Sequence, residues 1–234
     1  DMEWSMLGLN PKHRSGRFEE GLEILRRFWT EEEPFAFQGK HWDLDGVWLN
    51  PKPLQQPHPP TFVVAVFSAK AMDRVARMGF DVGGWGGFFT GLTGGAVWKQ
   101  WLQNWRAACE RNGRSAEYAK LNTFGSCFVT DDPDSAWAEH REGALASFNY
   151  ERQGVRPYSS LLMDRTPEKP EDLPNWKRLF MTPEQAIAEL REVYAAGAPD
   201  ELHLMATRSG MSWQQSAQFL QNFAEQVMPA VKDL

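Results

Sequence analysis

The apolar run from Thr61 to Val66 is the strongest local signal in the chain. It is rich in β-branched residues and is bounded by Pro59-Pro60 before it and Ser68 after it. A continuous apolar run of this length predicts a parallel strand that is covered on both faces. Ser68 fits the N-cap of a following helix, and Gly79 fits the left-handed position at which that helix would end. The stretch therefore predicts a strand, a helix and a second strand in succession.

Three further apolar segments follow and alternate with helical patterns. Four strands are expected in all, near residues 61–66, 80–84, 121–130 and 201–206. Strands separated by helices predict an α/β protein with a parallel sheet. A short hairpin is expected at about 35–44, ahead of the first of these strands. The segment 150–181 contains several prolines and has little pattern, which is typical of a variable binding loop.

The spacing of apolar residues and the presence of capping residues predict several helices. A helix entered at Asn10-Pro11 is expected to turn one apolar face inward, and two capping boxes begin at Thr182 and Ser212. A Trp-rich helix is also expected to bury one face. The residues of these two apolar faces are Phe18, Leu22, Leu25 and Trp29 in the first helix, and Trp98, Trp101, Leu102, Trp105 and Cys109 in the second.

Composition narrows the classes of protein that fit. With 234 residues, of which 42% are hydrophobic, the chain can form one domain, 1–234, with a sizeable core. The net charge of −6 argues against a nucleic-acid or anionic-membrane partner. The two cysteines, Cys109 and Cys127, have neither disulfide nor metal-ligand spacing, so we expect no metal and a reducing, cytoplasmic location.

The usual catalytic motifs are absent from the sequence, which contains no GxSxG, HExxH or CxxC. The glycines at 84 and 86 fall short of a dinucleotide-binding fingerprint, because Phe89 stands where the third glycine is required. His140 lies on an apolar helical face and is expected to be packed in the core. His203 lies on a predicted strand and could face either way. The absence of these catalytic motifs is typical of an enzyme whose cofactor carries out the chemistry.

Three stretches together resemble the bacterial luciferase-like, flavin-dependent oxidoreductases. They are LGLNPKHRSGRFEEGLEILRRFW near the start, PKPLQQPHPPTFVVAV in the middle, and PEQAIAELREVYAAGAPDELHL with NFAEQVMP near the end. The resemblance implies a (β/α)8 TIM barrel of which only the C-terminal half is present, in a chain truncated at its N-terminus. It implies reduced FMN or the deazaflavin F420 as cofactor, and it makes 150–181 a segment that shapes the substrate site.

The resemblance also suggests which residues would bind the cofactor. A phosphate-binding arginine is expected in the first long helix, where Arg14 is preferred over Arg17. The phosphate would further contact Ser68 and the backbone amides of Ala69 and Lys70, because a helix N-terminus carries free N–H groups and positive potential. Trp85 would lie near the flavin ring. The alternatives are that Arg14 pairs with Glu19 or Glu20, that Ser68 only caps its helix, and that Trp85 packs the barrel rim.

Three functions follow as hypotheses. The first is an FMN-dependent monooxygenase that acts on a small organic substrate and receives reduced flavin from a separate reductase. The second is an F420-dependent dehydrogenase or reductase. The third is a non-catalytic half barrel that binds flavin or a partner. A four-stranded parallel sheet cannot close, so its first strand would have an exposed edge; either the chain is truncated, which is favoured, or this half pairs with another chain. A homodimer is also expected. The catalytic residues are expected on the earlier barrel strands and have no assignment in this sequence.

Overall fold

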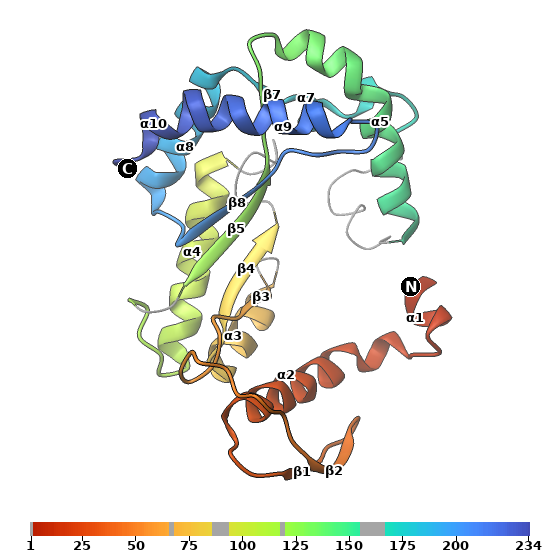
Figure 1. Ribbon diagram of the computed structural model, residues 1–234, viewed down its shortest axis with the longest axis vertical. Coiled ribbons are helices and arrows are strands. Elements are labelled where there is room, and N and C mark those ends of the chain that lie inside the picture. Colours follow the sequence, from red (N-terminus) through yellow and green to blue (C-terminus); the bar gives the residue numbers. More distant parts are fainter. Residues whose placement is uncertain (1, 66–67, 86–93, 118–119, 155–166) are drawn as a thin grey trace. The chain divides into compact units, whose positions relative to one another are not determined.

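The computed structural model describes residues 2–65, 68–85, 94–117, 120–154 and 167–234 (Figure 1). The chain divides into two compact units, Asp1–Thr61 and Phe62–Leu234. The larger unit contains the sheet, and the smaller one contains the first long helix and a hairpin. The assignment of 1–234 to one domain stays a prediction.

The larger unit is built on a four-stranded parallel sheet, as the sequence predicts. The order of the strands is β3-β4-β5-β8, so neighbours in the sheet are also successive strands of the barrel pattern. The strands are β3 Phe62–Val64, β4 Asp81–Trp85, β5 Leu121–Ser126 and β8 Glu201–Met205. All three pairings are parallel. Helices connect these strands, which gives the predicted α/β class and the partial set of barrel strands.

The expected strand over 121–130 is wrong in its second half. The chain leaves the sheet after Ser126, and β6 (Phe128–Val129) pairs instead with β7 (Phe180–Met181) in a separate parallel ladder. The physical reason is an aromatic cluster, in which the rings of Phe128 and Phe180 stack with centroids 4.7 Å apart. His140 is buried against Phe180, in agreement with its expected place in the core. Thus the end of the 150–181 segment forms regular structure; its residues 155–166 lie outside the described chain.

Two helices of the larger unit, α8 and α9, begin at the predicted capping boxes. Thr182 and Ser212 each close a capping box, with a side-chain oxygen accepting from the amide of Gln185 and Gln215 respectively. The helical elements are α3 Ala69–Met78, α4 Gly94–Arg111, α5 Pro133–Gly154, η2 Pro170–Asp172, α7 Pro174–Lys177, α8 Pro183–Ala196, α9 Trp213–Asn222, η3 Phe223–Val227 and α10 Met228–Val231.

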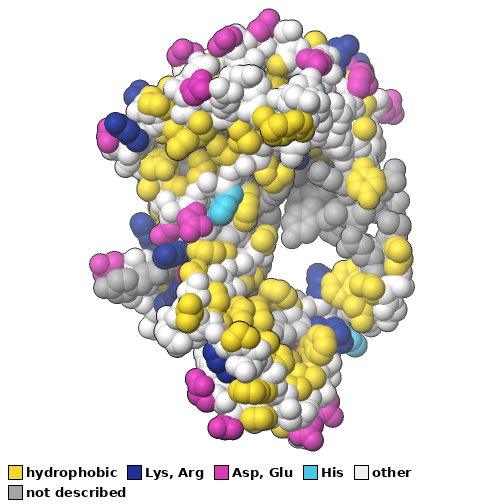
Figure 2. Space-filling view, in the orientation of Figure 1, with side chains coloured by type: hydrophobic (Ala, Val, Ile, Leu, Met, Phe, Trp, Pro, Cys, Tyr) yellow, Lys and Arg dark blue, Asp and Glu magenta, His cyan; other side chains and the backbone are white. Residues whose placement is uncertain are grey.

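One face of the sheet is buried, and the other is open around Val64 and His203, although Asn122 and Ser126 on that face are buried. Strand register places Val63, Val82 and Leu121 on one face, where all three are buried. Helix α4 buries the whole predicted tryptophan face, including Trp98 and Trp105. Val64 points to the opposite face and is 62% exposed. Apolar, acidic and histidine side chains lie side by side in Figure 2, in the region of β5 and β8.

Both cysteines lie in this core. Burial raises the pKa of the Cys109 thiol to about 11, and burial raises the pKa of Cys127 well above its usual value. Both thiols are therefore protonated at neutral pH, when a thiolate would be needed for nucleophilic or redox chemistry. Both side chains are buried among the core residues of the folded protein.

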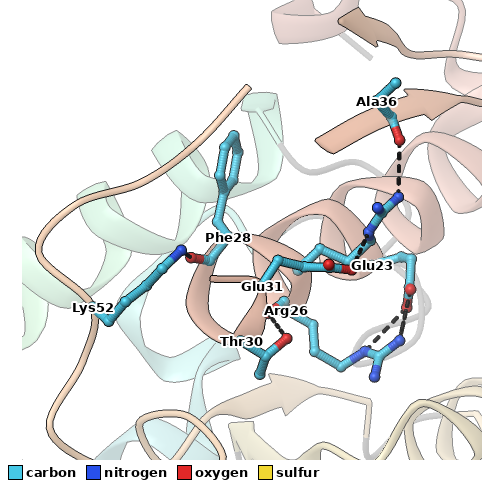
Figure 3. A network of polar contacts seen from close by, with 8 residues as sticks. Glu23, Arg26, Phe28, Thr30, Glu31, Ala36 and Lys52 are labelled. Atoms are coloured by element: carbon cyan, nitrogen blue, oxygen red, sulfur yellow. Dashed lines mark hydrogen bonds and ion pairs between the residues drawn. The ribbon is translucent and has the colours of Figure 1, made fainter. Parts of the chain in front are cut away.

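The smaller unit consists of α1 (Met2–Met6), η1 (Pro11–His13), α2 (Arg14–Thr30) and an antiparallel pair, β1 (Phe35–Gln38) and β2 (Asp43–Val47). Side-chain hydrogen bonds join α2 to the segments around it (Figure 3). The Arg27 guanidinium donates to the carbonyl of Ala36, and the Lys52 ammonium donates to that of Phe28. The hairpin therefore approaches α2 from the side of Glu20 and Arg27. Phe18 stays 47% exposed, so the predicted apolar face is wrong at this position.

Glu20 attaches the hairpin to α2 through three backbone amides. Those of Lys40, His41 and Trp42 donate to its carboxylate at 2.9, 2.9 and 3.1 Å. Burial alone would raise the pKa of Glu20, but these hydrogen bonds and the nearby His41 lower it overall. A lowered pKa means that the carboxylate contributes stability above its unfolded-state pKa and loses that contribution as the pH falls through the folded-state value.

We therefore expect Glu20→Gln to destabilise the protein at neutral pH and to approach wild-type stability in acid. The measurement is the free energy of unfolding of both proteins by urea denaturation between about pH 3 and pH 7, which spans the titration of a carboxyl group. A difference that is the same at every pH would contradict the role of the charge.

Candidate cofactor-binding site

The N-terminus of α3 lies directly after β3, at the carboxyl end of the sheet. Ser68 is extended, with φ −146° and ψ 118°, and its Oγ accepts from the Ala71 amide at 3.3 Å. Its carbonyl accepts from the Met72 amide at 3.0 Å. These contacts confirm Ser68 as the N-cap. Gly79 ends α3 in the left-handed region, with φ 81°. Burial of Met72, Val75 and Ala76 holds the helix on the sheet.

This helix end has the electrostatics of an anion site. The first turn of α3 contains no acidic residue, and Ser68, Ala69 and Lys70 are all exposed. An α-helix leaves its first amides without intrahelical acceptors and concentrates positive potential there. The Ser68 hydroxyl accepts a bond as a cap, which leaves its own proton available to donate. The residues present therefore fit the phosphate of FMN or F420.

Trp85 lies at the same edge of the sheet as Ser68. It is the last residue of β4 and pairs in register with Phe124 of β5. The amide of Ala65 donates to the carbonyl of Gly83 at 3.3 Å, which aligns the ends of β3 and β4. The structure therefore brings the Ser68 and Trp85 positions to one edge. The glycine- and aromatic-rich residues 86–93, with Phe88 and Phe89, lie outside the described chain.

Arg14 is the first residue of α2, in the smaller unit. Its guanidinium donates to the carbonyl of Pro11 at 3.0 Å and is exposed. The guanidinium of Arg17 instead lies over the ring of Trp42 at 4.7 Å, so that side chain packs on the hairpin. Glu20 binds hairpin amides, as described above. Arg14 is thus the more accessible of the two arginines, and its place beside the α3 site stays a prediction.

A second group of polar residues at the carboxyl ends of β5 and β8 was missed in the sequence. Arg208 follows β8 by three residues, and its Nη2 donates to Ser126 Oγ at 2.7 Å. The guanidinium lies over the ring of Trp176 in α7, 4.8 Å from its centroid. The sequence feature that could have indicated this group is the position of Arg208 just after the last predicted strand. The partners of Arg208 could not be read, because they are 82 and 32 residues away in the chain.

His203 faces the open side of the sheet, together with Glu201. The two side chains approach to 3.1 Å, and the imidazole stacks on Phe124 with centroids 5.0 Å apart. The Asn122 amide group donates to the same Glu201 carboxylate at 2.9 Å. In register, His203 and Phe124 lie level with Trp85, the last residue of β4, whereas Glu201 and Asn122 lie two residues nearer the beginning of the strands.

Two other kinds of site find no support in the described ranges. No group of three or more His, Cys, Asp or Glu side chains there is arranged to hold a metal ion. None of the helices in the same ranges is both long and apolar enough to cross a membrane.

The chain belongs to the luciferase-like monooxygenase family, whose pattern matches residues 1–226. Its fold is similar to that of a monooxygenase from Streptomyces bottropensis, with a TM-score of 0.73 and 20% identity over 97% of this chain and 64% of that one. It is also similar to an F420-dependent secondary alcohol dehydrogenase, with a TM-score of 0.67 and 17% identity over 98% of this chain and 66% of that one. No curated protein matches the sequence.

A third similar structure has FMN bound. It is the oxygenating constituent of 3,6-diketocamphane monooxygenase from the CAM plasmid of Pseudomonas putida, with a TM-score of 0.60 and 16% identity over 90% of this chain and 62% of that one. The chain thus spans less than two thirds of each of these structures. At these identities the similarity establishes the luciferase-like barrel fold, and family members use FMN or F420.

Ser68 can be tested separately as a cap and as a phosphate ligand. We expect Ser68→Ala to lower the free energy of unfolding by about 0.5–2 kcal/mol, since the Ala71 amide loses its acceptor. Ser68→Asp keeps a good cap, but its carboxylate would repel a phosphate. We therefore expect Ser68→Asp to keep stability and to lose FMN affinity, measured by urea unfolding and by fluorescence titration. Wild-type FMN affinity in Ser68→Asp would make Ser68 a cap only.

Proposed function

We propose that this protein is a monooxygenase that uses reduced FMN and molecular oxygen to oxygenate a small organic substrate. A separate flavin reductase would supply the reduced FMN, and the protein would act as a homodimer. The observation that carries the proposal is the open, capped N-terminus of α3 at the carboxyl edge of a luciferase-like sheet. Active sites of parallel barrels form at this edge.

Bound FMN would supply the reaction with oxygen, and the residues of this chain would bind and orient it. The amides of Ala69 and Lys70 and the hydroxyl of Ser68 would donate to the phosphate. The Arg14 guanidinium would add a bidentate, charge-assisted pair. The backbone places Trp85 at the same edge, where an aromatic residue can lie beside a flavin ring.

An F420-dependent dehydrogenase or reductase is the second candidate. It is favoured by the similarity to the F420-dependent alcohol dehydrogenase, which covers 98% of this chain. Both cofactors carry a phosphate that the α3 site could bind. They differ in reaction, because the first candidate consumes oxygen whereas the second transfers hydride without it.

The experiment that decides between them is a pair of titrations followed by turnover. The purified protein is titrated anaerobically with reduced FMN and with reduced F420, and oxygen uptake is then measured with a flavin reductase and NADH. Tight binding of FMN with substrate-dependent oxygen uptake supports the monooxygenase. Selective binding of F420 without oxygen uptake supports the second candidate.

A non-catalytic half barrel is the third candidate, favoured by the open face of the sheet around Val64 and His203. It predicts a dimer that binds neither cofactor productively. Light scattering after size-exclusion chromatography, combined with the titrations above, separates it from both enzymes. A dimer without turnover would overturn the monooxygenase proposal.

A further inference from the structure

We propose that Arg208 is a positioning residue that fixes α7 against the carboxyl ends of β5 and β8, which makes Trp176 a wall of the substrate pocket. The inference rests on the proposed function for its substrate and on the structure for its geometry. It assigns substrate selection to a specific contact between the last barrel strand and the 170–181 part of the variable segment.

Arg208 has a fixed place at the strand ends. Ser126, the last residue of β5, is only 3% exposed and pairs in register with Met205, the last residue of β8. The 2.7 Å bond from Arg208 Nη2 to Ser126 Oγ therefore ties the loop after β8 to the end of the neighbouring strand. A parallel barrel binds its substrate at this edge.

The same guanidinium holds Trp176. Its central carbon lies 4.8 Å from the centroid of the indole, within the range of a cation–π contact. Phe148 of α5 meets the indole edge-on at 5.9 Å, so the ring is supported from two elements. Trp176 is the third residue of the four-residue α7, and it is half-buried. The planar guanidinium of Arg208 thus joins the ends of β5 and β8 to α7.

The loop that carries Arg208 is itself held closely. An added Cβ at Gly143 of α5 would lie 2.1 Å from the carbonyl oxygen of Ser209, so the two backbones touch at a position that only glycine permits. This close approach limits how far Arg208 can move. A rigid support is what a positioning residue requires, because small displacements of a binding wall weaken substrate selection strongly.

Two ion pairs that involve this segment lie on the surface. Arg141 meets Glu171 at 3.2 Å and Lys177 meets Asp134 at 2.7 Å, with all four side chains substantially exposed. Exposed pairs of this kind contribute little. Lysine could not replace Arg208 fully, because an ammonium cannot both stack flat on an indole and donate from a planar fork. The Arg208 contact is therefore expected to set the position of α7.

The first test measures position directly, by hydrogen exchange with mass spectrometry on peptides from 170–181. Arg208→Ala is expected to raise exchange there roughly ten-fold, and Arg208→Lys by less, since it keeps the charge but not the fork. Arg191→Ala, which removes an exposed arginine from α8, is the matched control and should leave these peptides unchanged. Wild-type exchange of 170–181 in Arg208→Ala would overturn the proposal.

The second test measures selection, with a series of substrates of increasing size. Arg208→Ala and Trp176→Ala are expected to change the ratio of kcat/KM between small and large substrates in the same direction, mainly through KM. Trp176→Phe should change it less. An unchanged ratio in both alanine variants would overturn the role in selection. Absence of any flavin-dependent turnover in the wild type would overturn the proposed function, while the exchange experiment would still decide the positioning role.

Discussion

Trp98→Ala is expected to lower the free energy of unfolding by about 3–5 kcal/mol, as for other buried tryptophans replaced by alanine. The Trp98 side chain is 0% exposed. Its indole N–H donates to the carbonyl of Gly197, just after α8, so it joins α4 to the end of a second helix. The substitution removes both a large apolar contact and the donor for a backbone carbonyl. Urea unfolding monitored by circular dichroism measures the loss.

Trp213 supplies a matched control for this prediction. It is 75% exposed at the start of α9, so Trp213→Ala should change stability by no more than roughly 0.5 kcal/mol. Trp98→Phe keeps most of the apolar contact and should lie between the two alanine variants. Equal losses in Trp98→Ala and Trp213→Ala would show that α4 is not packed as described.

Arg14→Ala is expected to weaken FMN binding by about 1.5–3 kcal/mol, the range for a hydrogen bond to a charged group, or roughly ten- to 150-fold in Kd. The reason is the loss of a charge-assisted pair with the FMN phosphate, as proposed above. In the described chain its guanidinium donates to the Pro11 carbonyl in an exposed contact, so stability should change little. The measurement is anaerobic fluorescence titration with FMN.

Lys12→Ala is the matched control, because Lys12 is an exposed cation two residues away that uses its backbone amide, and not its side chain, to bind Asn10. It should leave the Kd nearly unchanged, whereas Arg14→Lys should fall between Arg14→Ala and the wild type. An unchanged Kd in Arg14→Ala would remove Arg14 from the site. Riboflavin, which lacks the phosphate, is the control ligand. If Arg14→Ala weakens the binding of riboflavin as much as that of FMN, Arg14 contacts another part of the flavin.

The sequence determined the features that depend on near neighbours in the chain. The β-branched run before Ser68, the cap itself and Gly79 predicted β3 and α3, and the structure has them in place. The boxes at Thr182 and Ser212 fixed two further helix starts. A capping hydrogen bond joins residues no more than four positions apart, so a short stretch of sequence is enough to predict it. The resemblance of three stretches to the luciferase-like oxidoreductases also indicated the barrel family.

The tertiary structure decided every feature that depends on residues far apart in the chain. Strand β5 ends at Ser126, because Phe128 stacks on Phe180 outside the sheet. His203 faces the open side of the sheet, because it pairs in register with Phe124. The tertiary structure also brought Arg208 to Ser126 and Trp176. The alternation of apolar residues along a strand does not show which other strand it pairs with. The position of an arginine in the sequence likewise does not show which distant residues its guanidinium contacts. Only packing of the complete sheet and its helices selects among these arrangements.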